Sequence, residues 1–196
     1  MSGSDDITKQ VLDAARAAYG ARGYLNTTIK GVAAAAGVAP DVVRRYYDNR
    51  EALFAAAMRL PVDPGTSIAQ LLAPGIDGLG ERMVRVTLRM LDDPETREQL
   101  TEMVRAGAGA TRATASLREF FESAVVDRVV GFLGVPDARM RVTLATSYLL
   151  GIATTRYVLK VEPIASATED EIVLLVAPAV QAALTTPTAP PGRPRG

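Results

Sequence analysis

Apolar residues recur at helical spacing along almost the whole of this 196-residue chain, and the alternation typical of strands is scarce. Glycines and prolines interrupt the pattern where helices would begin or end. The pattern predicts an all-α protein of nine or ten helices. The expected helices cover about 5–19, 28–35, 40–47, 48–60, 66–73, 76–92, 95–107, 112–133, 137–160 and 169–184.

The segment Pro61–Gly65 contains two prolines and is the clearest internal boundary. It separates a smaller N-terminal domain, residues 1–60, from a larger helical domain, residues 61–184. Residues 185–196 hold four prolines and almost no apolar side chain, so we expect them to form a disordered tail.

The chain contains no cysteine and no histidine. These absences exclude disulfides, zinc–thiolate sites, thiol nucleophiles, Ser-His triads and histidine-based metal catalysis. No spacing of carboxylate, lysine or tyrosine side chains indicates another kind of catalytic centre. We therefore expect a protein that is not an enzyme and that uses no metal or cofactor.

The first residues of the chain are polar and acidic, unlike a secretory signal. No stretch approaches the roughly 20 uninterrupted apolar residues that a membrane-spanning helix needs. These two features predict a soluble, cytoplasmic protein with no membrane partner.

Two predicted helices of about two turns each flank Gly37, and helices this short are unstable alone. A tight turn between them requires a positive φ, which glycine adopts without steric cost. Ala33 allows the two helices to approach closely, while Val32, Val38 and Val43 supply a small core. This is the spacing of a helix-turn-helix. The helix that follows is expected to begin at Asp48 or Asn49, where Asp48 and Glu51 can form a capping box.

Residues 23–53 resemble the N-terminal domain of the TetR (tetracycline-repressor) family. The matching elements are Gly23-Tyr24, Thr27-Thr28, Val32-Ala33, Ala36-Gly37-Val38, Tyr46-Tyr47, Arg50-Glu51 and Leu53. The resemblance implies a DNA-binding transcriptional regulator, in which the second short helix enters the major groove of a double-stranded operator.

The resemblance also implies which residues contact DNA. Threonines at the start of the first short helix and an arginine at the start of the fourth helix would bind phosphates. The expected DNA-contacting residues are Thr27, Thr28, Lys30, Pro40, Asp41, Arg44, Arg45, Tyr46 and Arg50. Either Arg44 or Arg45 can bind a guanine edge through two hydrogen bonds.

Several of these positions have a second interpretation. Ala39 stands where the family often has a serine cap, so the second short helix loses a side-chain cap. Asp41 can accept a hydrogen bond from cytosine or can simply complement the helix N-terminus. The alternative for Thr28 is that it caps the helix and does not contact DNA. Tyr47 is interpreted as a core residue because its family counterpart faces inward.

The net charge of the chain is zero, which at first argues against DNA binding. The charge is unevenly divided, however. Residues 20–50 carry five basic and two acidic side chains, whereas residues 61–196 carry 14 basic and 16 acidic ones. The helix-turn-helix region is therefore positive by three charges, which is modest and predicts weak non-specific DNA affinity.

Methionines and aromatic residues in the larger domain suggest a pocket for a small apolar or amphipathic effector. The candidate pocket residues are Leu79, Met83, Val86, Met90, Met103, Phe120, Phe121, Tyr148 and Arg156. Leu117 belongs to the same apolar series. Each can equally belong to a packed core, and Arg156 can form an ion pair between helices.

The helices at 137–160 and 169–184 resemble the pair that forms a four-helix dimer interface in the family. The last helix is apolar nearly all round and must be covered on two sides. A core within one subunit is the alternative. A two-fold homodimer would place the recognition helices about 34–36 Å apart, which implies a palindromic operator.

These features together predict a homodimeric, ligand-responsive regulator, more a repressor than an activator. The alternative is a helical small-molecule-binding or sequestering protein with degenerate DNA contacts, which Ala39 and Asp41 motivate.

Overall fold

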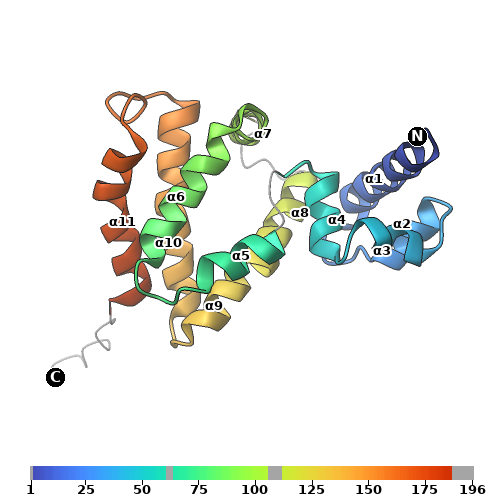
Figure 1. Cartoon of the computed structure of the whole chain (residues 1–196), viewed down its shortest axis with the longest axis horizontal. Helices are drawn as coiled ribbons and strands as arrows, with labels where there is room; N and C mark the ends of the chain where they lie inside the picture. The colour runs from blue at the N-terminus through green and yellow to red at the C-terminus, as the bar shows by residue number, and fades with distance from the viewer. Residues whose placement is uncertain (1, 61–63, 106–111, 187–196) are drawn as a thin grey trace, which may run out of the picture.

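The computed structural model describes residues 2–60, 64–105 and 112–186, and every regular element in these ranges is a helix (Figure 1). Two π-helical turns, η1 and η2, continue the helices that precede them, so the described ranges form ten continuous helices. The all-α prediction is confirmed. The elements are α1 (Ser2–Arg22), α2 (Ile29–Ala35), α3 (Pro40–Tyr46), α4 (Arg50–Ala57), α5 (Pro64–Leu72), α6 (Leu79–Asp92), α7 (Pro94–Arg105), α8 (Arg112–Phe121), η1 (Glu122–Val126), α9 (Asp127–Leu133), α10 (Ala138–Ala153), η2 (Thr154–Val158) and α11 (Glu169–Thr185).

The start of α4 agrees with the predicted position at Asn49, but its capping differs from the prediction. The N-cap is Asn49, whose side chain accepts a hydrogen bond from the Ala52 N–H at 2.7 Å. The predicted capping box of Asp48 and Glu51 is wrong, because Asp48 lies outside the helix and Glu51 instead accepts a hydrogen bond from the Tyr24 hydroxyl.

The end of α4 also comes three residues earlier than predicted, at Ala57. Arg59 adopts a φ of 53°, and the Leu60 N–H donates to the Ala55 carbonyl at 2.7 Å. This is the left-handed termination that glycine more often provides. The predicted boundary after residue 60 and most of the predicted tail fall on 61–63 and 187–196, which lie outside the described residues.

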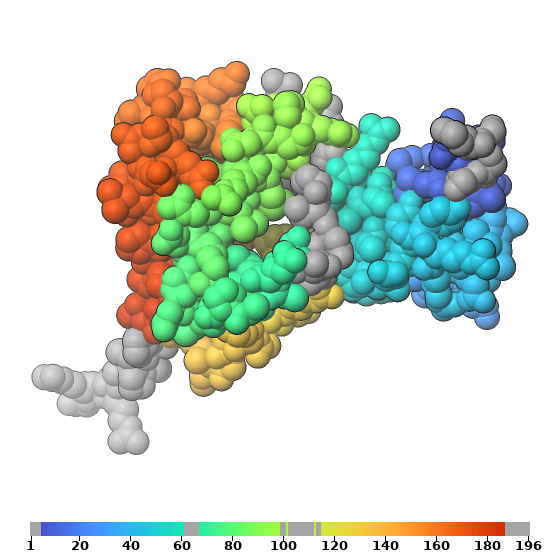
Figure 2. Space-filling view, viewed as in Figure 1, coloured from blue at the N-terminus to red at the C-terminus, as the bar shows by residue number. Residues whose placement is uncertain are grey.

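The described helices pack around two apolar cores. The first core lies among α1–α4, which form one end of the molecule, drawn in blue to cyan in Figure 2. The second core lies among α6, α9, α10 and α11 at the other end. Helix α8 runs toward the first core, and its Phe120 is buried there together with Ala124 of η1.

Helices α6 and α11 approach each other closely at Gly80. An ideal Cβ at this position would lie 2.6 Å from the Ala177 carbonyl oxygen and 2.6 Å from the Gln181 nitrogen, both backbone atoms. The Gln181 side chain accepts a hydrogen bond from the Gly80 N–H at 2.8 Å and donates to the Ile76 carbonyl at 3.0 Å. The two helices therefore pack with backbone in contact with backbone.

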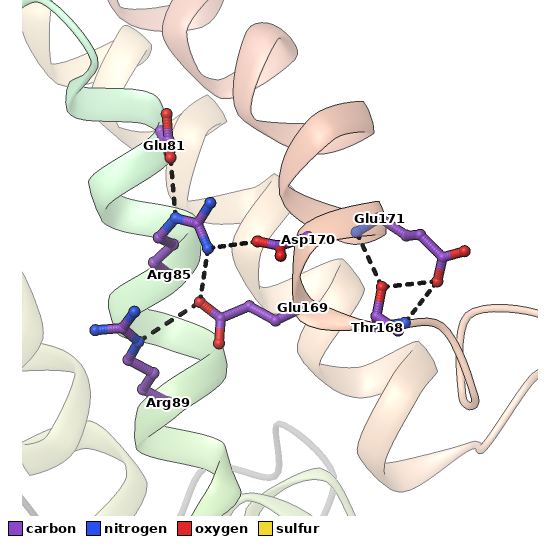
Figure 3. A network of polar contacts seen from close by, with 7 residues as sticks. All are labelled: Glu81, Arg85, Arg89, Thr168, Glu169, Asp170 and Glu171. Atoms are coloured by element: carbon purple, nitrogen blue, oxygen red, sulfur yellow. Dashed lines mark hydrogen bonds and ion pairs between the residues drawn. The ribbon is translucent and has the colours of Figure 1, made fainter.

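An ion-pair network holds α6 against the start of α11 (Figure 3). The Arg85 guanidinium bonds Glu81 at 2.9 Å, Glu169 at 3.0 Å and Asp170 at 2.9 Å, and Arg89 lies 3.5 Å from Glu169. The three carboxylates raise the pKa of Arg85 above its usual value. Because these groups are partly exposed, the network fixes geometry more than it adds stability.

The first turn of α11 is closed by a capping box between Thr168 and Glu171 (Figure 3). The Thr168 hydroxyl accepts from the Glu171 N–H at 3.2 Å, and the Glu171 carboxylate accepts from the Thr168 N–H at 2.7 Å. The Thr168 N–H and, at 2.8 Å, the Thr168 hydroxyl both donate to the Glu171 carboxylate and lower the pKa of Glu171. The predicted start of the last helix at 169 is confirmed.

Replacing Gly80 by alanine is expected to destabilise the protein by about 1–3 kcal/mol, because rigid backbone meets the added methyl group. Gly131 on α9 is the matched control, since nothing lies within 4 Å of a Cβ there. Gly131→Ala should be neutral or slightly stabilising. Urea denaturation at one protein concentration measures both variants, and equal stability of the two would contradict the close approach.

Candidate nucleic-acid interface

The helix-turn-helix is formed by α2 and α3. Gly37 has a φ of +65°, and the Val38 N–H donates to the Ala33 carbonyl at 3.0 Å to close the turn. Val32 and Val43 are fully buried between the helices. The predicted turn and its core are confirmed.

The start of α2 contains two threonines with different roles. Thr27 is buried, and its hydroxyl donates to the Gly23 carbonyl at 2.8 Å, so this hydroxyl is used within the loop. Thr28 is exposed and caps α2 by accepting from the Gly31 N–H at 3.1 Å. The Lys30 side chain is also exposed on this helix.

Helix α3 carries its charged side chains on the outside of the domain. Asp41 and Arg44 form an exposed ion pair of 3.1 Å, with side-chain exposures of 87% and 57%. Arg45 is exposed, and no described residue forms an ion pair or hydrogen bond with its side chain. The outer surface of α3 therefore presents one neutralised arginine and one unneutralised arginine.

Both ends of α3 agree with the predictions made from the sequence. Ala39 makes no side-chain cap, and Pro40 occupies the first turn, as expected. At the other end Tyr46 is 44% exposed, whereas Tyr47 packs partly buried against the first core. The interpretation of Tyr47 as a core residue is confirmed.

Arg50 lies at the start of α4 and contacts the loop between α1 and α2. Its guanidinium carbon is 4.3 Å from the centre of the Tyr24 ring, and one nitrogen donates to the Leu25 carbonyl at 3.4 Å. The Tyr24 hydroxyl donates to Glu51 at 3.2 Å. Burial raises the pKa of Tyr24, and the neighbouring Arg50 charge opposes that shift.

Four aromatic rings form the centre of the first core. Phe54 stacks on Phe120 at 4.4 Å between ring centres and meets the edges of Tyr19 at 4.7 Å and Tyr24 at 5.0 Å. Phe120 was expected in an effector pocket, but the structure places it here, on the side of α8 that faces α4. An apolar residue at helical spacing does not reveal which of two cores it enters.

Two polar residues of α8 also contact the first domain, and neither is among the site residues predicted from the sequence. The buried Ser116 hydroxyl donates to the Tyr19 carbonyl at 2.9 Å, and Glu119 accepts from the Leu25 N–H at 3.0 Å. With Phe120 they are spaced i, i+3 and i+4, the spacing of one helix face. That spacing was the available signal.

The remaining pocket candidates whose side chains the structure describes have different surroundings. Leu79 and Met83 are buried in the second core, Met90 is half-buried, and Val86 is 40% exposed. The Met103 side chain lies outside the described residues. Phe121 is 36% exposed at the end of α8.

The last two candidates, Tyr148 and Arg156, point to different surroundings. Tyr148 is 48% exposed and lines a groove between α10 and α11. Arg156 donates to the Ile164 and Ala167 carbonyls, both at 2.6 Å, rather than forming an ion pair between helices. Arg156 lies within the π-turn η2, which begins at Thr154 and changes the helical register, so a spacing of eight residues does not place the two side chains on one face.

Comparison with known proteins agrees with this geometry. Residues 11–57 match the family model of bacterial regulatory proteins of the tetR family, and residues 77–184 match that of the tetracyclin repressor-like C-terminal domain. The chain belongs to the TetR family. Its helix-turn-helix lies within the first match, and the second covers α6 to α11 except for the last residue of α11, Thr185.

Solved structures show the same fold. A TetR-family regulator from Streptomyces coelicolor is 33% identical with a TM-score of 0.54, and the match covers 94% of this chain and 97% of that one. NalD, the secondary repressor of the MexAB-OprM multidrug efflux pump in Pseudomonas aeruginosa, is 14% identical with a TM-score of 0.52, over 93% and 98% of the two chains. No curated protein sequence shows significant similarity to the chain.

As a TetR-family member, the protein is a ligand-responsive, DNA-binding transcriptional regulator. The family binds DNA operators and small molecules, typically as dimers. None of the helices in the described ranges has the length and apolar character to span a membrane.

Replacing Phe120 by alanine is expected to destabilise the protein by about 3–5 kcal/mol, because Phe120 is 3% exposed and its removal leaves a cavity in the aromatic core. The neighbouring Phe121 is 36% exposed and provides the control. Phe121→Ala should cost much less. Thermal unfolding of both variants tests the placement of Phe120 in the first core. A larger loss of stability in Phe121→Ala than in Phe120→Ala would contradict it.

Proposed function

We propose that the protein is a homodimeric repressor that binds a palindromic operator through α3 and releases it when a small molecule binds. The observation that carries this proposal is the outward position of Arg44 and Arg45 on the second helix of a helix-turn-helix. An arginine on such a helix can bind the O6 and N7 atoms of guanine in the major groove. The regulator would act in the cytoplasm, where it meets bacterial chromosomal DNA.

The proposed phosphate contacts come from residues around α3, the helix proposed to enter the major groove. Exposed Thr28 and Lys30 lie at the start of α2, Tyr46 ends α3, and Arg50 is half-exposed beside them. These four side chains contribute hydroxyl groups and positive charge, which are the usual partners of phosphate oxygens. Their contacts fix the register of α3 on the duplex.

The proposed dimer interface is the outer surface of α10 and α11. Large apolar side chains are exposed there, with Leu175 at 78% and Leu174 at 75%. On α10 the exposed set is Met140, Leu144, Tyr148 and Leu150. Leu144, Tyr148 and Leu175 line a common groove between the two helices. Exposed apolar side chains gathered in this way mark an interaction site, and a second copy of the same helix pair would cover them with a four-helix arrangement.

We place the effector in the C-terminal domain. The half-buried Met90 and the buried Met83 lie on α6, and methionine side chains can adapt to apolar ligands. Arg156 has a buried Nε atom without a hydrogen-bond partner among the described residues, which supports a polar group on the ligand. An effector with the usual coupling would weaken operator binding about 5- to 150-fold.

The second candidate function, a sequestering protein with degenerate DNA contacts, is favoured by the uncapped start of α3 and by the Asp41–Arg44 pair. Incubation of the purified protein with fragments of host genomic DNA distinguishes the two. Recovery of a palindromic fragment whose binding weakens steeply with salt supports the regulator.

Arg45→Ala is expected to weaken binding to that fragment about 5- to 150-fold, because one bidentate base contact is lost. The protein should remain folded and dimeric, since the Arg45 side chain is exposed. Lys160→Gln removes the same charge from an exposed position in the other domain and should bind normally. Fluorescence anisotropy measures both, and unchanged operator affinity of Arg45→Ala would refute its role in base recognition.

Leu175→Glu is expected to give a folded monomer, because a charge at a buried dimer contact is left without a partner. Operator affinity should fall more than about a hundredfold once the two half-sites are no longer bound together. Val135→Glu, at an exposed apolar residue outside both helices, is the control. Sedimentation velocity reports the oligomeric state. If the Leu175→Glu variant remained dimeric, α11 would not be part of the dimer interface.

A further inference from the structure

The loop between α1 and α2, residues 23–28, connects directly to the predicted phosphate contacts at Thr28 and Lys30. Its first residue, Gly23, has a φ of +84°, and its N–H donates to the Tyr19 carbonyl at 3.0 Å. The Thr27 hydroxyl closes the other end of the loop on the Gly23 carbonyl. The position of α2 therefore depends on the position of this loop.

The loop is held from outside by α8, which belongs to the C-terminal family match. Glu119 accepts the Leu25 N–H at 3.0 Å, and Ser116 donates to the same Tyr19 carbonyl that receives the Gly23 N–H. A Cβ at position 23 would lie 3.0 Å from one Glu119 carboxylate oxygen and 3.3 Å from the other. Glycine at 23 thus permits both the turn and the approach of the carboxylate.

Leu25 is held at both of its backbone polar groups. Its N–H is bound by Glu119 of α8, and its carbonyl accepts a hydrogen bond from Arg50 of α4 at 3.4 Å. The negative group comes from the C-terminal domain and the positive group from the DNA-binding domain. This arrangement ties the loop to both domains at one residue.

We propose that Glu119 is a positioning residue for operator binding. By fixing Leu25, it orders residues 23–28 before DNA arrives and sets the place of α2 and α3 relative to the dimerisation helices. Ordering a binding loop in advance lowers the cost of association. The role rests on the proposed DNA-binding function of α2 and α3.

The test compares Glu119→Ala, Glu119→Gln and the control Glu122→Ala in the full-length protein. Glu122 is exposed three residues further along, and its side chain forms no hydrogen bond or ion pair with the described residues. The probes are the selected genomic duplex and a scrambled duplex of equal length. Hydrogen exchange of the Leu25 amide, the melting temperature and the sedimentation coefficient are measured on the same samples.

Glu119→Ala is expected to lose about tenfold in affinity for the selected duplex, the scale of one charge-assisted hydrogen bond. Exchange of the Leu25 amide should accelerate while melting temperature and dimer state stay close to those of the wild type. Glu119→Gln keeps an acceptor oxygen and should restore most of the affinity. Removing a negative charge near DNA favours binding by itself, so a loss cannot be a charge effect, and Glu122→Ala should show none.

Wild-type affinity of Glu119→Ala overturns the proposal, as does a loss of the same size with Glu119→Gln. A loss that is matched by a fall in melting temperature would reduce Glu119 to a stabilising residue and also overturns it. If Arg45→Ala loses operator binding while Glu119→Ala does not, only the positioning role fails. If the wild-type protein selects no duplex, the proposed function fails, and the positioning role fails with it.

Discussion

The stack of Phe120 on Phe54 determines how the two parts of this regulator are joined. The helix-turn-helix and its flanking helices have a small core, and a ring from residue 120 completes it. Burial of the Phe120 ring stabilises the contact between the domains, but the hydrophobic effect does not favour one orientation of that contact. The hydrogen bonds of Ser116 and Glu119 on the same face of α8 are directional, so they fix the orientation of the contact that the ring stabilises. The DNA-binding domain therefore owes part of its core and its orientation to the other domain.

The C-terminal domain is held together in a different way. Gly80 brings the backbones of α6 and α11 into contact, and Arg85 of α6 binds two carboxylates, Glu169 and Asp170, at the start of α11. Because α11 is fixed along this side, its opposite side is left to the solvent with Leu174 and Leu175 exposed. A rigid helix with an uncovered apolar face suits a dimer interface, since little ordering is needed when the second copy binds.

Local features of this fold could be predicted from the sequence, and long-range ones could not. Gly37, Val32 and Val43 define the helix-turn-helix because turn geometry and short-range apolar spacing suffice. The extents of the later helices followed from prolines and periodicity. The core that Phe120 enters could not be predicted, because helical spacing shows which residues share a helix face but not which other helix that face contacts. The separation of Tyr148 from Arg156 could not be predicted either, because it depends on the π-turn η2, which has no clear sequence signal.

The charge distribution explains why the joint between the domains matters for DNA binding. The helix-turn-helix region carries an excess of three positive charges, and Asp41 neutralises one of its arginines in the free protein. Non-specific attraction to the phosphate backbone is therefore weak. In the proposed dimer, tight binding comes from base contacts made by two subunits at once, and those contacts require a fixed spacing between the two copies of α3. In this proposal the residues that set the spacing lie on α8 as well as on α10 and α11, and operator affinity would depend on side chains that never touch DNA.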